Sequence, residues 1–182
     1  MRIISLSLVY LFLSACSSMV NIDYDRSINF NSLTRYNIHT IPVRVTDDTR
    51  INTPFMQQRI VHAIDVALAN KGFQKKSKNN DLDIKYYLDL KQDFETDESA
   101  ISVGIGSSGY HSAIGFGFAM PVGETYSIDK LVLTIDIFST KTKKLLWRGS
   151  LAYRLASGAT PESNIKMVKE LVEEILERFP PK

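Results

Sequence analysis

The chain contains a single cysteine, Cys16, at the end of an apolar N-terminal segment. Arg2 precedes an apolar run from Ile3 to Leu13 that only two serines interrupt, and the small pair Ser14-Ala15 follows it. A positive start, a short apolar middle and small residues before a cut are typical of a secretory signal peptide. Because the cysteine directly follows the small pair, we predict a lipoprotein signal over residues 1–15, with Cys16 as the lipidated first residue of the mature chain.

The lone cysteine also limits how the fold can be stabilised. No second cysteine is present, so the chain must fold on its hydrophobic core without an intramolecular disulfide, even in an oxidising compartment. Two alternatives for Cys16 are a buried small hydrophobe and an unpaired thiol in a secreted protein. Neither explains its position at the cleavage site. The apolar run is shorter than the roughly 20 residues of a spanning helix, which argues against a permanent transmembrane anchor.

The residue after the cysteine indicates which membrane carries the lipoprotein. Ser17 stands where an aspartate would favour retention in the inner membrane, so the sorting pattern favours the cell outer membrane. Two or more acyl chains on Cys16 would give a stable attachment. We therefore expect a protein that is held at the outer membrane by its lipid and faces the periplasm.

Composition and charge fit one ordinary domain. With 182 residues and 44% hydrophobic residues, the chain is neither long enough to require several domains nor polar enough for disorder. The formal net charge of +2 gives no reason to expect a nucleic-acid partner. Two local lysine clusters stand out, Lys75-Lys76-Lys78 and Lys141-Lys143-Lys144. We favour solvated loops for both; the alternative is contact with anionic lipid head groups.

The first half of the mature chain predicts a leader, a strand and a helix. Residues 16–34 are polar and are interpreted as a leader that partly docks on a single domain over residues 35–182. Arg35 to Val45 is rich in β-branched and aromatic residues and predicts a strand. Thr53-Pro54 predicts the start of a helix, by a capping residue and a proline at the first helical position, and Gly72 predicts its end.

The second half predicts three strands and a helix. Alternating residues indicate strands over Asp81–Lys91, Lys130–Ser139 and Lys144–Arg154, the last two forming a hairpin. In the last strand the inward residues are expected to be Leu145, Trp147, Leu151 and Tyr153. Thr160-Pro161 predicts a second capped helix that Pro180-Pro181 ends. Its apolar stripe is predicted to consist of Ile165, Val168, Val172, Ile175 and Phe179.

The order β-α-β-β-β-α predicts an α/β fold. Two helices with one apolar stripe each can cover one face of a four-stranded, mostly antiparallel sheet, which gives a two-layer sandwich. The first β-α-β unit is a candidate for a parallel pair with a right-handed crossover. The sequence leaves the strand order open.

A glycine-rich insertion over residues 93–126 separates the second and third strands. Gly104, Gly106 and Gly109 match G-x-G-x-x-G, but no helix follows as a dinucleotide site requires. Apolar residues alternate with small ones, and the apolar residues are Ile101, Val103, Ile105, Ile114, Phe116, Phe118 and Met120. We favour a mobile or sheet-covering loop; the alternative is an apolar flap that meets a lipid, ligand or partner surface.

No catalytic constellation is visible. His39, His62 and His111 fall on different expected elements without the spacing of metal ligands. Asp23 and Asp25 lie in the leader and do not define an acid/base pair. We therefore predict no metal, no cofactor and no enzyme, with an unrecognised hydrolase as the minor alternative.

Several short motifs together resemble a family of bacterial envelope lipoproteins known as domain of unknown function 4136. The matching motifs are Asp23-Tyr24-Asp25 followed by Phe30, the capped helix from Pro54 to Lys71-Gly72, Asp81-Leu82, Lys144-Leu145-Leu146-Trp147-Arg148-Gly149, and Phe179-Pro180. The resemblance covers most of the mature chain. It implies a lipoprotein of the outer-membrane class with an α/β fold, and it supplies no catalytic residue.

These features lead to one functional hypothesis and one alternative. The hypothesis is a non-catalytic, membrane-tethered periplasmic domain that binds another envelope component, a protein or a lipid, through a sheet edge or the glycine-rich flap. The alternative is a lipid or small-molecule carrier with a pocket between the sheet and the insertion. The element order also resembles auxiliary lipoproteins of envelope lipid transport, at the level of fold only.

Overall fold

The computed structural model describes residues 20–42, 44–96, 125–156 and 158–181. Within these ranges the chain forms seven strands, two α-helices and one 3-10 helix, η1. In chain order they are β1 (Asn21–Tyr24), η1 (Phe30–Ser32), β2 (Arg35–Ile38), β3 (Arg44–Val45), α1 (Pro54–Asn70), β4 (Gln74–Lys75), β5 (Leu82–Thr96), β6 (Thr125–Ser139), β7 (Leu145–Arg154) and α2 (Pro161–Glu177). None of the helices in this part of the chain is both long and apolar enough to cross a membrane.

The strands form one mixed sheet in the order β1-β7-β6-β5-β2-β4, with β3 also paired to β5. The pairs β1/β7, β7/β6 and β6/β5 are antiparallel, whereas β2/β4, β2/β5 and β3/β5 are parallel. The predicted parallel pairing across the first β-α-β unit is therefore confirmed. The predicted four-stranded sheet is wrong, because three short strands were not recognised. The three long strands, β5, β6 and β7, pair antiparallel as predicted.

β2 and β3 arise where the sequence suggested one strand. The expected strand over Arg35–Val45 is interrupted, and its two parts, β2 and β3, pair with different stretches of β5. Pro42 lies in the break; proline has no N–H to donate to a strand ladder, so it disfavours a continuous strand. In the leader, β1 pairs with β7 and Phe30 is buried in the core, so this segment docks on the sheet as a strand.

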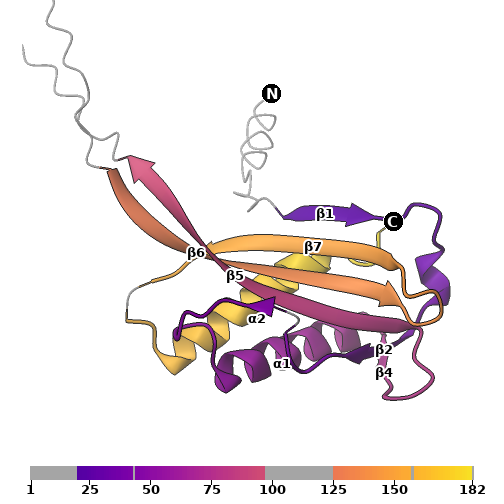
Figure 1. The fold of residues 1–182 in the computed structure, drawn as a ribbon. Coiled ribbons are helices and arrows are strands. Elements are labelled where there is room, and N and C mark those ends of the chain that lie inside the picture. The colour runs from indigo at the N-terminus through magenta and orange to yellow at the C-terminus, as the bar shows by residue number, and fades with distance from the viewer. Residues whose placement is uncertain (1–19, 43, 97–124, 157, 182) are drawn as a thin grey trace, which may run out of the picture.

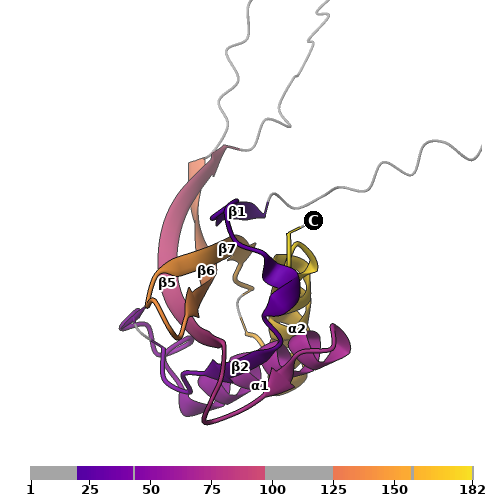
Figure 2. The same ribbon diagram turned by 90° about the vertical axis from the view of Figure 1, so that its right-hand side faces the viewer.

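Both helices cover the same face of the strongly curled sheet (Figures 1 and 2). They run side by side in the same direction, and the Lys71 ammonium at the end of α1 donates to the Glu177 carbonyl oxygen at the end of α2 over 3.5 Å. Thr53 caps α1, its hydroxyl accepting from the Met56 N–H over 3.1 Å. Thr160 and Ser163 cap α2 reciprocally. The predicted starts of both helices are confirmed.

The core lies between the sheet and the helices and follows most of the predicted stripes. The alternating residues of β5 and β6, from Leu82 to Leu88 and from Leu131 to Ile137, are buried as expected. In β7, Leu145 and Tyr153 are exposed rather than buried. A β-bulge at Ile137/Phe138 shifts the pairing, and Leu146 takes a buried position in place of Leu145.

The start of the buried stripe of α2 also differs from the prediction. Ile165 is 54% exposed, whereas the buried stripe begins two residues later and consists of Met167, Val168, Leu171, Val172, Ile175 and Leu176. Ile165 therefore belongs to the outer surface of the helix layer rather than to the core.

Beyond the sheet, β5 and β6 continue as a two-stranded ribbon that projects from the domain (Figure 1). They stay paired as far as Thr96 and Thr125, whereas β7 pairs with β6 only from Lys130 onward. The two strands thus enter the predicted insertion from both sides. Its glycine-rich centre lies outside the described residues.

Candidate functional site

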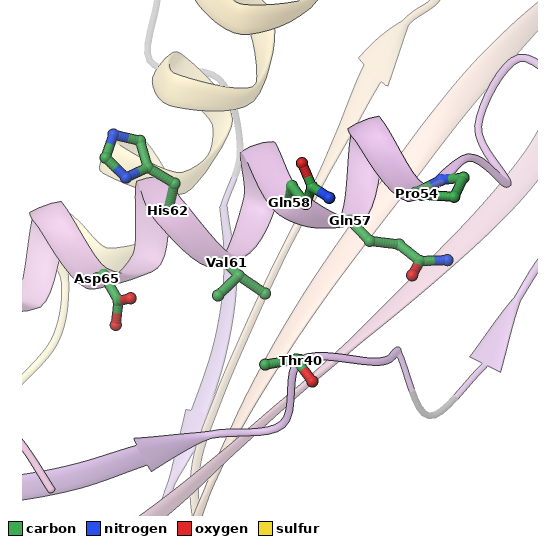
Figure 3. A pocket seen from close by; sticks show the side chains of 7 residues that line it. All are labelled: Thr40, Pro54, Gln57, Gln58, Val61, His62 and Asp65. Carbon is green, nitrogen blue, oxygen red and sulfur yellow. The ribbon is translucent and has the colours of Figure 1, made fainter. Parts of the chain in front are cut away.

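A hollow of about 370 Å³ lies between α1 and the connection from β2 to β3 (Figure 3). It is lined by Thr40, Pro54, Gln57, Gln58, Val61, His62 and Asp65. Figure 3 shows Gln57, Val61 and Asp65 on the side of α1 that faces Thr40, with Gln58 and His62 on the other side. Gln57, Val61 and Asp65 are four residues apart, so these three form one strip along the helix.

The carboxylate in this hollow is already engaged. Asp65 accepts a hydrogen bond from the Tyr36 hydroxyl over 3.2 Å and forms an ion pair with Lys75. Burial, and next the Asp65 charge, raise the pKa of Tyr36 above its ordinary value. Both groups are therefore held as a neutral phenol and a paired carboxylate, an arrangement that does not provide a free general base.

A second hollow, of about 450 Å³, is a groove between α1 and α2 on the outer side of the helix layer. It is lined by Gln58, Arg59, His62, Ala63, Val66, Ile165, Lys169 and Glu173. Val66 and Ile165 are 40% and 54% exposed there. Gln58 and His62 border both hollows. We call this second hollow the helix groove.

The sequence explains why the helix groove is apolar at its floor and charged at its rim. On α1, Arg59, Ala63 and Val66 are four and three residues apart, and on α2 Ile165, Lys169 and Glu173 are four apart. Each set therefore forms one line along its helix. Lys169 and Glu173 lie 3.9 Å apart at the rim, and Arg59 is close enough to Glu162 to act on its carboxylate. The helix groove can accept an apolar segment that carries charges at its border.

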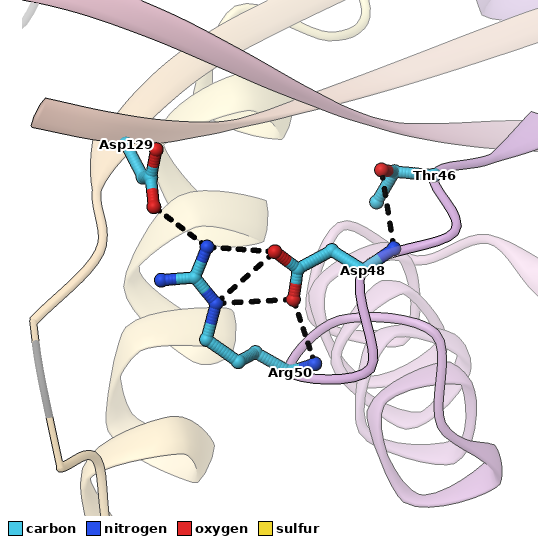
Figure 4. Close-up of polar contacts among 4 residues, drawn as sticks. All are labelled: Thr46, Asp48, Arg50 and Asp129. Atoms are coloured by element: carbon cyan, nitrogen blue, oxygen red, sulfur yellow. Dashed lines mark hydrogen bonds and ion pairs between the residues drawn. The ribbon is translucent and has the colours of Figure 1, made fainter.

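Arg50 links the loop before α1 to the base of the ribbon (Figure 4). Its Nη2 lies 2.7 Å from an oxygen of Asp48 and 2.6 Å from an oxygen of Asp129 on β6. The hydrogen bonds from Arg50 lower the pKa of Asp48, and the bonds to both carboxylates raise the pKa of Arg50. Because one guanidinium bridges two carboxylates, this cluster is suited to holding the loop in place.

An ion pair with a buried carboxylate lies on the sheet face that the helices leave open. Asp136, which is fully buried, accepts two hydrogen bonds of 2.6 Å from Arg148 directly across the β6–β7 ladder. Burial, followed by the Asp136 charge, raises the pKa of Tyr87. The bidentate geometry compensates for the removal of Asp136 from water. It also leaves the carboxylate no free oxygen for chemistry.

The structure separates the residues that the sequence singled out. His39 is exposed after β2, whereas His62 borders both hollows. Asp23 lies opposite Arg148 in the β1–β7 pairing, and Asp25 accepts a hydrogen bond from Ser27 over 2.6 Å. Among the described residues no group of three histidine, cysteine, aspartate or glutamate side chains could hold a metal. Cys16, His111 and the glycines at 104–109 lie outside the described part.

Sequence reasoning missed the groove residues Arg59 and Val66 and misplaced Ile165. The available signal was apolar residues that fall beside the core stripe of an amphipathic helix. Arg50 carried no comparable signal, since its partner Asp129 is 79 residues away.

The fold is shared with a solved structure of low sequence identity. A DUF4136 family protein from Bacteroides thetaiotaomicron matches 90% of this chain and 96% of its own, with a TM-score of 0.53 and 14% identity. Lipoprotein GNA1162 from Neisseria meningitidis matches 79% of this chain and 99% of its own, with a TM-score of 0.43 and 11% identity.

A PDZ domain protein from Parabacteroides distasonis gives a TM-score of 0.49 at 13% identity over 91% of this chain, which spans 36% of that protein. No curated protein matches the chain. The family model of the domain of unknown function DUF4136 matches residues 20–181. This match confirms the resemblance carried by the sequence motifs: the chain belongs to the DUF4136 family.

Proposed function

We propose that this protein is a lipid-anchored component of the outer membrane that faces the periplasm, has no catalytic role, and binds another cell-envelope protein through the helix groove. The observation that carries the proposal is the exposure of Val66 and Ile165 over an apolar floor between two helices. Exposed apolar surface gathered in one groove and bordered by polar groups is typical of a docking surface.

The shape and the charges of the groove favour an amphipathic helix as the partner segment. Two parallel helices form a straight trough in which apolar side chains of a third helix can lie at three- and four-residue spacing. At the rim, Arg59 and Lys169 carry positive charge, with Glu162 in reach of Arg59 and Glu173 beside Lys169. A partner helix with carboxylates beside its apolar face would complement these cations.

The described polar groups support a non-catalytic role. Asp65, Asp136 and Asp48 are each held by a cation. Within the ranges that the structure describes, no histidine hydrogen-bonds to a serine, threonine or carboxylate in the manner of a nucleophile–base pair.

A small-molecule or lipid carrier is the second candidate. The hollow beside Thr40 has about 370 Å³, within the size range of ligand pockets. A carrier that uses this hollow would retain its cargo on purification. Native mass spectrometry of the purified chain would then detect a bound lipid or small molecule.

Photo-crosslinking tests the groove directly. We would replace Ile165 by a photo-reactive amino acid in the full chain, irradiate intact cells, and identify the crosslinked peptide by mass spectrometry. We expect the adduct on an apolar helical segment with acidic neighbours. Val66→Asp should abolish it, because a carboxylate on the groove floor would be desolvated by the partner. Leu145→Asp, a matched change of an exposed apolar residue outside the groove, should not.

The same experiment can contradict the proposal. An adduct that persists in Val66→Asp, or no adduct to any protein, would exclude groove docking, and an adduct to lipid would favour the carrier.

The lipid anchor has its own test. Cys16→Ser should leave the precursor uncleaved and without acyl label, and normal labelling of that variant would refute lipidation.

A further inference from the structure

The end of the sheet opposite the ribbon joins two loops that are far apart in sequence. The Thr140 N–H donates to the Asp81 carbonyl oxygen over 2.9 Å, and the Asn80 amide donates to the Thr140 hydroxyl over 2.9 Å. The β4–β5 connection and the β6–β7 turn are thereby fixed side by side. Figure 2 views the molecule from this end.

These contacts merge the two lysine clusters into one surface, which we call the lysine end. Its members are Lys75, Lys76, Lys78, Lys141, Lys143 and Lys144, and all six are exposed. Lys75 pairs with Asp65, and Lys143 with Asp83 at 3.3 Å. The other four make no side-chain hydrogen bond or ion pair with any described residue. The Lys144 charge acts on the Asp25 carboxylate, and the charges of Lys76, Lys78 and Lys141 are available to a partner.

Several hydrogen bonds hold the backbone beneath these lysines in place. Asn80 donates to the Leu82 carbonyl and to Asp83 as well as to Thr140, and Ser139 accepts from the Thr142 N–H over 3.1 Å. Both α-helices also end on this side, where a cation complements the negative end of a helix dipole. Lys71 does so for α2. The structure thus presents exposed ammonium groups on a backbone that is fixed by hydrogen bonds.

We propose that the lysine end binds the surface of an anionic phospholipid bilayer. Interfaces between proteins are depleted in lysine and depend on tryptophan, tyrosine and arginine anchors. The six cations that define the lysine end are all lysines, and Asp65 and Asp83 are the ion-pair partners of two of them. Flexible point charges spread over two turns suit the diffuse charge of head groups. Each lysine near such a surface adds about fivefold to binding. This inference does not depend on the helix groove.

Amine footprinting of the full chain tests it. The purified protein is reconstituted with vesicles of neutral phosphatidylcholine, or of the same lipid mixed with anionic phosphatidylglycerol, and acetylation of each lysine is followed by mass spectrometry. On anionic vesicles we expect labelling of Lys76, Lys78, Lys141 and Lys144 to slow roughly tenfold, since several contacts act together. Lys166, which is exposed on α2, is the internal control and should not change.

Salt and substitution sharpen the test. Raising salt to about 1 M should restore labelling, because the screening length falls to about 3 Å. Lys76→Gln/Lys78→Gln should weaken protection of Lys141 and Lys144, and Lys166→Gln should not. Equal labelling on neutral and anionic vesicles would overturn the proposal. So would protection by a soluble acidic peptide without protection by vesicles, which would assign this end to a protein. Either result would leave groove docking untouched.

Discussion

At the scale of single residues, Gly149 in β7 leaves no room for a side chain. The fully buried Trp147 indole lies against it, so a Cβ at position 149 would overlap the ring and come within 2.8 Å of Ile175 Cγ2. The same indole packs on Phe179, with ring centroids 5.3 Å apart, and therefore cannot move aside. Its Nε1–H has no acceptor among the described residues. The ring is therefore positioned by packing rather than by a hydrogen bond.

We expect Gly149→Ala to lower the free energy of unfolding by roughly 1–3 kcal/mol, the range for overpacking a core. Urea denaturation would measure the change. Ser150→Ala, a neighbouring change on the opposite sheet face, should stay within about 0.5 kcal/mol. An unchanged midpoint for Gly149→Ala would show that the indole can shift after all.

At the scale of elements, Asp81 joins β2 to the start of β5. Its carboxylate accepts from the Arg35 side chain over 2.8 and 3.1 Å and from the Arg35 N–H over 3.1 Å. The hydrogen bond from the Arg35 guanidinium is the main cause that lowers the pKa of Asp81 from 3.8 to about 2. A lowered carboxylate pKa stabilises the fold above the unfolded value, near pH 4, and the stabilisation is lost as the pH falls through about 2.

Asp81→Asn should therefore lower the free energy of unfolding at pH 7. The difference in this free energy between the variant and the wild type should shrink between pH 4 and pH 2. Arg35 is 45% exposed, so solvent screening limits the loss to about 1 kcal/mol. Urea denaturation over a pH series provides the measurement. Asp89→Asn, which breaks the more exposed pair with Arg44, is the matched control and should have a smaller effect. A difference that stays constant down to pH 2 would exclude the ionic account.

Elements with a strong local pattern could be predicted from sequence, and short strands could not. Thr53-Pro54 and Thr160-Pro161 carry their helix starts in adjacent residues. The long alternation in β5 and β6 likewise specifies strands. β1, β3 and β4 have only two to four residues. Such strands exist because a distant partner offers free backbone groups, as Ser150 does for Asn21, and no local pattern records that partner.

The candidate surfaces show the same limit. Ile165 lies three residues before Val168, a spacing that fits the core stripe, and only the packing of the two helices places it in the groove. Both lysine clusters were visible in the sequence as separate loops. Their union depends on the bond from Thr140 to Asp81, which the order of strands creates. The sequence identified these residues, but it did not show that they lie close together.

In the whole molecule, the distance from the predicted lipid on Cys16 to the lysine end is short. β1 begins five residues after Cys16, and five residues span at most roughly 17 Å. Asn21 lies opposite Ser150, which is five residues from Leu145 at the start of β7, again roughly 17 Å along a strand. The two lengths are equal, so a bilayer that holds the lipid is within reach of the lysine end.

Lengthening the tether should therefore weaken the lysine contact. Insertion of about 20 glycine and serine residues after Ser18 would raise the tether from five residues to about 25. The effective concentration of the lysine end at the bilayer would fall about tenfold, since it decreases with the −3/2 power of length. We expect protection of Lys76 and Lys141 on anionic vesicles to fall accordingly, with acyl labelling and the unfolding midpoint unchanged. The same insert after Pro181 should leave protection intact. If the tether insert also leaves it intact, the lipid and the lysine end do not act on one bilayer.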